Sequence, residues 1–295
     1  MSLLNLVLML TLILLYTFQS FFSATYSKNY PGKSNLSSLI FSIVSGAIVV
    51  IVTFAFSGLS FSASPFTVLF GIIVGLVLVL YNTSLIKASK SGSYSIVMVF
   101  SIAGGTICPV ISTAIMGERH SPMKLICIAI VLISVYMISR KKGTVEKPKK
   151  HFFLYCFLLA LANGSYISLL DLQQRITGES EKDEMAIIAY SLCTVISAII
   201  LIAKEKKNSL RAFKQTKTSL IFILLSSIVT ALALNLFVTL INLMNDSTLL
   251  FTIENSGVYL ASVLFSVIFF KEKLSLLNVI GCLTLCIVLV GITFF

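Results

Sequence analysis

Apolar residues occupy this chain in long runs, and polar residues are confined to the short stretches between them. Ten runs, most of about 20 residues, are each long enough to cross a hydrocarbon core of about 30 Å as a helix. The predicted spans are Leu3–Phe22, Asn35–Ser57, Pro65–Ile86, Ser93–Met116, Met123–Ser139, Phe152–Asp171, Met185–Ala203, Ser219–Ile241, Ser247–Phe270 and Leu274–Phe294. The pattern therefore predicts an all-α integral membrane protein with ten transmembrane helices.

The composition excludes several classes of protein. Hydrophobic residues make up 57% of the 295 positions and charged residues 11%, whereas soluble domains average about 25% charged. The net charge of +11 lies in short connections without an aromatic platform, so we expect no nucleic-acid partner. Cys282 and Cys286 share a helix face without a nearby His or acid, which favours packing thiols over a metal site. We expect no enzyme activity and no cofactor.

The basic residues predict which way the chain faces. Eighteen of the 22 Lys and Arg residues fall in the first, third, fifth, seventh and ninth connections between spans. Cytoplasmic connections carry such an excess, so this side is predicted to face the cytoplasm and both termini to lie outside. The first run has no basic residue before it and no cleavage site near its end, which favours a retained helix over a signal peptide. Compact connections favour a bacterial inner membrane.

The chain also repeats itself. A basic linker at 144–150 separates residues 1–143 from residues 151–295, and each half holds five predicted spans. A shift of 154 residues aligns Glu118 with Glu272, where the fourth span of each half ends. Because five is odd, the second half enters the membrane from the opposite side. Such inverted-topology repeats are a recurrent plan of secondary transporters, and they predict two five-helix halves around a central cavity.

The segment 245–292 carries a family resemblance. It contains the Lys271-Glu272-Lys273 run that closes one span and the Ile280-Gly281 pair within the next. With the two halves of five spans, this resembles EamA-like transporters of the drug/metabolite transporter superfamily. The resemblance implies ten helices around a central cavity, alternating access and no need for ATP. It leaves open whether the solute is an amino acid, a sugar, a nucleobase or a drug.

Glu254 is the outlier among the apolar runs. It lies inside the ninth span, and a charge at the centre of a membrane helix costs roughly 2.5–3.5 kcal/mol. No Lys or Arg lies at a matching depth, so a carboxylate that binds a proton and a substrate in turn is one interpretation. A protonated glutamate that is hydrogen-bonded for packing is the other. The helix face shared with Ser247, Phe251, Val258 and Ala261 is the predicted cavity wall.

Other polar side chains inside the spans are candidate substrate contacts. They are Asn255, Ser101, Tyr94, Gln19, Asn163, Tyr166, Tyr81 and Asn235. Gln19 and Asn163 occupy similar places in the two halves, and the 154-residue shift aligns Tyr81 with Asn235. Taken alone, each is more often a bond between helices, and that alternative stays open.

These observations predict a secondary active transporter of small organic solutes such as amino acids, metabolites or cationic drugs. We expect it to act as a proton-coupled exporter by alternating access, with the solute, protons and the lipid bilayer as its partners, and to function as a monomer. An uncoupled facilitator or channel is one alternative. A flippase for lipid intermediates is another, and it requires basic groups in the cavity, for which Lys87 and Lys90 are the candidates.

Overall fold

The computed structural model describes residues 3–32, 34–115, 117, 121–139, 149–177, 181–206, 213, 216–243 and 247–292. These residues form helices and contain no strand. The helices are α1 (Leu3–Asn29), α2 (Ser34–Phe56), α3 (Pro65–Ser91), α4 (Tyr94–Ile115), α5 (Pro122–Ser139), α6 (Phe152–Thr177), α7 (Lys182–Glu205), α9 (Lys217–Leu243), α10 (Ser247–Ile268) and α11 (Leu276–Ile292).

Several helices extend past the apolar spans. The first span was predicted to end at Phe22, but α1 continues to Asn29 through Ser23, Tyr26 and Lys28. Hydropathy marks only the stretch that hydrocarbon requires, whereas the backbone hydrogen bonds of a helix continue into the polar interface. The apolar pattern therefore located the helices and underestimated the lengths of α1, α3, α6, α7 and α9, whereas α10 ends two residues before the predicted Phe270.

Seven helices, α1, α2, α3, α4, α6, α7 and α9, are long and apolar enough to cross a membrane. In α5, α10 and α11 the described apolar stretches are shorter, at Ile126–Ile138, Ile253–Ile268 and Leu276–Val288. The chain is an α-helical, multi-pass membrane protein. The number of ten spans and the inverted repeat remain predictions.

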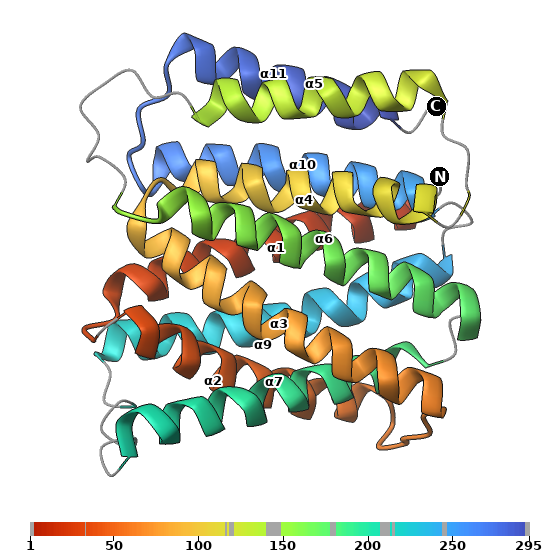
Figure 1. Ribbon diagram of the computed structural model, residues 1–295, viewed down its shortest axis with the longest axis vertical. Helices are drawn as coiled ribbons and strands as arrows, with labels where there is room; N and C mark the ends of the chain where they lie inside the picture. Colours follow the sequence, from red (N-terminus) through yellow and green to blue (C-terminus); the bar gives the residue numbers. More distant parts are fainter. Residues whose placement is uncertain are drawn as a thin grey trace.

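The helices stack in paired levels across the bundle (Figure 1). From one edge to the other, the levels hold α5 with α11, α4 with α10, α1 with α6, α3 with α9, and α2 with α7. In this view, each level therefore holds one helix of residues 1–143 and one of residues 151–295. Exchanging the two helices within each level turns some packing pairs into others. The pair α1 and α9 becomes α6 and α3, and the pair α1 and α10 becomes α6 and α4; all four pairs are in contact.

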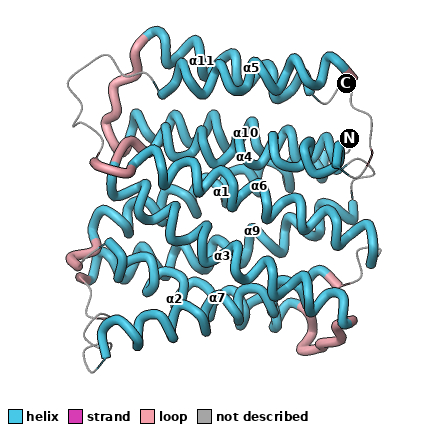
Figure 2. The backbone as a smooth tube through the Cα atoms, in the orientation of Figure 1, coloured by secondary structure: helices cyan, strands magenta, loops and turns pink. Residues whose placement is uncertain are grey.

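The connections that the structure describes lie at the two ends of the bundle (Figure 2). At one end, where α1, α3 and α10 finish, the Lys90 ammonium donates a hydrogen bond of 2.9 Å to the Gly32 carbonyl. At the other end, where α3 and α7 begin, the Ser64 hydroxyl donates one of 2.7 Å to the Glu181 carboxylate. We call these the basic end and the acidic end.

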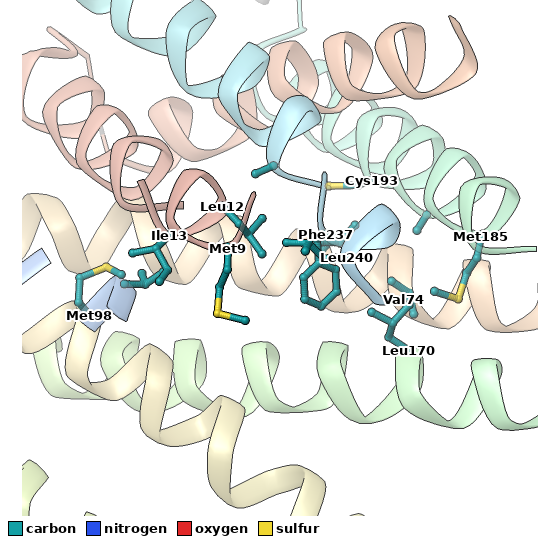
Figure 3. Close-up of a cluster of buried hydrophobic side chains, with 14 of the residues drawn as sticks. Met9, Leu12, Ile13, Val74, Met98, Leu170, Met185, Cys193, Phe237 and Leu240 are labelled. Carbon is teal, nitrogen blue, oxygen red and sulfur yellow. The ribbon is translucent and has the colours of Figure 1, made fainter. Parts of the chain in front are cut away.

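The largest apolar cluster lies between the helices of both halves (Figure 3). Its buried side chains include Met9, Leu12 and Ile13 of α1, and they meet residues of α3, α4, α6, α7 and α9. Leu12 is fully buried, and Phe237 retains 6% of its exposure. This cluster holds the middle of the bundle together and leaves one cavity wall partly apolar.

Candidate functional site

A cavity of about 130 Å³ lies at mid-height in the bundle. Three of its lining residues, Tyr16, Leu78 and Thr230, are the central residues of the 27-residue helices α1, α3 and α9. At 1.5 Å per residue, each lies about 20 Å from either end of its helix. Helices α4, α6, α7 and α10 complete the wall, so both halves of the chain contribute to it.

Glu254 and Asn255 of α10 reach this cavity. Among the described residues, none forms a hydrogen bond or an ion pair with the Glu254 carboxylate, and no Lys, Arg or His lines the cavity. Val258, on the predicted cavity face, also lines it, but Ala261 does not. The side chains of Ser247 and Phe251 lie outside the described residues. A carboxylate without a protein partner at this depth is free to exchange protons or to meet a cation.

Four tyrosines from four helices surround the same space. Tyr16 of α1, Tyr81 of α3, Tyr166 of α6 and Tyr190 of α7 all line the cavity. The Tyr16 ring meets the Phe237 ring edge-on, with 6.3 Å between ring centroids. Only Tyr81 and Tyr166 were expected from the sequence. Tyr16 and Tyr190 sit in apolar runs, where a tyrosine that faces lipid has the same sequence signature.

The amides and Ser101 join helices as well as lining the cavity. Asn163 of α6 donates a hydrogen bond of 2.9 Å to the backbone carbonyl of Ser101 in α4. Tyr81 of α3 and Gln19 of α1 line the same space. All four residues line the cavity, so the bond between helices and the substrate contact are compatible here.

Two predicted site residues do not line the cavity. Asn235 donates its amide hydrogen to the Ala231 carbonyl of its own helix, at 2.9 Å. Tyr94 is fully buried, and its hydroxyl lies 2.7 Å from the Ser20 hydroxyl and 3.4 Å from that of Ser262. Ser20 lines the cavity, so its hydrogen-bond partner Tyr94 lies directly behind the cavity wall.

Glu272, beyond α10, holds the start of α4. Its carboxylate accepts hydrogen bonds from the Ser93 hydroxyl (2.6 Å), the Tyr94 backbone N–H (2.6 Å) and the Ser95 hydroxyl (2.6 Å). A longer bond of 3.4 Å comes from the Ser95 backbone N–H. The first N–H groups of a helix have no partner within it, and an acid here also suits the helix dipole. Glu272 therefore ties the two halves together at the basic end. Its repeat partner Glu118 lies outside the described residues.

Neither a metal site nor a basic substrate site is built here. In the ranges that the structure describes, no group of three His, Cys, Asp or Glu side chains could hold a metal ion. Lys87 lies over the Tyr155 ring at 5.3 Å, and Lys90 donates to the Tyr30 and Gly32 carbonyls. Both lysines are thus at the basic end and away from the cavity wall.

Comparison with known proteins gives a likeness of fold. No family model matches the chain, and no curated protein matches it. One solved structure, described only as "Crystal structure of protein", is similar with a TM-score of 0.61. The likeness covers 99% of this chain and 97% of that chain, at 17% identity. The whole arrangement of helices therefore occurs in another protein, and the likeness says nothing about substrate.

Proposed function

We propose that this chain is a proton-coupled secondary transporter of small organic solutes that works by alternating access. The observation that carries the proposal is a cavity at mid-height whose wall holds one carboxylate without a partner among the described residues. Intramembrane ionisable residues mark substrate or proton paths by default, because burying one for packing alone is costly. Glu254 is the group that binds the proton in one half of the cycle and meets the solute in the other.

The packing of the helices supports an inverted repeat as the moving frame. Exchange of the two halves turns several packing pairs into others: α1 with α9 becomes α6 with α3, and α2 with α9 becomes α7 with α3. The packing of α2 and α1 on α3 has no such counterpart among the described residues. Two halves related in this way can rock about a site between them. The cavity takes its wall from both, so neither half forms the site alone.

The basic end is the cytoplasmic end in this proposal. Eighteen of the 22 Lys and Arg residues lie in the connections that we assign to it. Both termini then lie outside a bacterial inner membrane, and transport runs outward in this proposal. Alkaline phosphatase fused after Phe295 is expected to be active and a green fluorescent protein fusion dark. A bright fluorescent fusion would reverse this orientation.

Transport in proteoliposomes with an imposed pH gradient tests the function. A mixed panel of organic cations, amino acids and nucleobases is used with wild type, Glu254→Gln and the control Glu184→Gln, which removes a carboxylate at the acidic end. Gradient-driven flux is expected in wild type and in the control, and a loss of at least tenfold in Glu254→Gln. Equal flux in all three without dependence on the gradient would instead make the protein an uncoupled facilitator. The flippase alternative gains no support from the cavity, since none of its described lining residues is basic.

A further inference from the structure

The side chains of the cavity wall favour a ligand with a net positive charge. Glu254 contributes a carboxylate, and no described lining residue contributes a Lys, Arg or His to balance it. A zwitterion such as an amino acid brings a carboxylate of its own, which would find only amides and hydroxyls near a second negative charge. A ligand with one positive charge and no negative charge neutralises Glu254 and leaves nothing unpaired.

The aromatic rings select a kind of cation. Tyr16, Tyr81, Tyr166 and Tyr190 line the space that Glu254 reaches, together with Phe237. Aromatic faces attract cations, and several rings around one space are the arrangement that recognises methylated ammonium groups.

The volume limits the size of that cation. The cavity of about 130 Å³ corresponds to roughly four waters at about 30 Å³ each. Pockets for drug-sized ligands measure roughly 300–1,000 Å³. A trimethylammonium head with a short tail fits the smaller space, whereas a large amphiphilic drug does not.

From charge, rings and volume together, we propose that the cavity binds a small methylated ammonium monocation, with Glu254 as its counter-ion and the four tyrosines as its cage. This inference deepens the proposed transport function and rests on it for the ligand's passage, but not for the binding itself. Protons and the cation then compete for one carboxylate. The titratable groups that face it are Tyr16, Tyr81, Tyr166 and Tyr190, and the lining residues of α4 and α9 include none.

Binding to the purified full-length protein in detergent tests the charge requirement. The probes are choline, its uncharged carbon isostere 3,3-dimethylbutan-1-ol, and glycine betaine, which adds a carboxylate to the same head. Calorimetry is expected to show choline binding at least tenfold tighter than either of the others. Equal affinity for choline and the uncharged isostere would overturn the proposal, and so would tighter binding of betaine than of choline.

Variants test the two parts of the cage. Glu254→Gln is expected to weaken choline binding at least tenfold and to remove the loss of affinity that wild type shows as the pH falls. Tyr190→Leu is expected to lose more affinity, by about threefold or more, than Tyr190→Phe, because the phenylalanine ring keeps the aromatic face. Thermal unfolding of each variant in the same detergent checks that it folds. A folded Glu254→Gln protein that binds choline as wild type does would contradict the proposal.

The outcomes separate this inference from the transport function. Gradient-driven flux of another solute class without choline binding would overturn the cation cage and leave the transporter. Choline binding without gradient-driven flux of any solute would keep the cage and overturn the proton coupling.

Discussion

Two glutamates near one helix differ in almost everything except their chemistry. Glu272 is 8% exposed, and its carboxylate accepts hydrogen bonds from two hydroxyls and two backbone N–H groups of residues 93–95. Glu254 lies in the middle of the bundle and has no such partner among the described residues. A buried carboxylate that is fully hydrogen-bonded strengthens a fold, whereas an unpaired one is costly. The comparison separates a structural acid from the acid that we propose to be functional.

The largest effect on stability is expected from Glu272→Ala. The change leaves the donors at the start of α4 buried without an acceptor, and each unsatisfied buried group costs about 1–3 kcal/mol. We expect a loss of roughly 3–5 kcal/mol, measured as a lower midpoint of thermal unfolding in detergent. Glu272→Gln keeps one acceptor oxygen, so its unfolding midpoint should lie between those of wild type and Glu272→Ala. An unchanged midpoint in Glu272→Ala would mean that this carboxylate does not hold the two halves.

Glu254→Gln should behave in the opposite way. Because the carboxylate has no protein partner to lose, its removal is expected to keep or raise the unfolding midpoint. Gradient-driven flux should nevertheless fall at least tenfold, which is about 1.4 kcal/mol or more. A destabilised Glu254→Gln protein would show that Glu254 is a packing residue, and the contrast between the two acids would disappear.

Ser95→Ala sharpens the comparison further. It removes one hydroxyl donor to Glu272, at 2.6 Å, and leaves the other three donors in place. Hydrogen bonds to charged groups contribute about 1.5–3 kcal/mol, so we expect a loss of about 2 kcal/mol. In the Glu272→Ala background, Ser95→Ala should cost less stability, since the carboxylate that accepts the Ser95 hydrogen bond is already absent. Equal costs in both backgrounds would exclude the bond as the source.

The smallest effect concerns Glu181 at the acidic end. Hydrogen bonds from Thr67 and Ser64 lower the pKa of its carboxyl below the ordinary value of 4.5. A lowered folded-state pKa stabilises the fold above the unfolded value, and this stability is lost as the pH falls from 4.5 through the folded value. The unfolding midpoint of wild type should therefore fall slightly more than that of Glu181→Gln between about pH 5 and pH 3. Parallel pH curves for the two proteins would contradict this.

The sequence predicted the positions of the helices better than the side-chain contacts between them. Long apolar runs identified the spans because hydrocarbon requires them, and the same requirement made Glu254 conspicuous. Tyr16 and Tyr190 escaped notice because an aromatic residue in an apolar helix has no signature that distinguishes cavity from lipid. Alignment of the halves paired Tyr81 with Asn235, yet only Tyr81 lines the cavity, because the two halves carry different side chains. The bond between Glu272 and residues 93–95 joins positions that no local pattern connects.

That bond also sets an order of events during synthesis. Glu272 follows Tyr94 by 178 residues, and chains grow at about 5–20 residues per second. The start of α4 must therefore wait roughly 10–35 s after it leaves the ribosome before its cap exists. During that interval water, lipid headgroups or the insertion machinery must satisfy its N–H groups. A ribosome that stalls before residue 272 leaves a nascent chain with α4 made but without the carboxylate that caps its first turn.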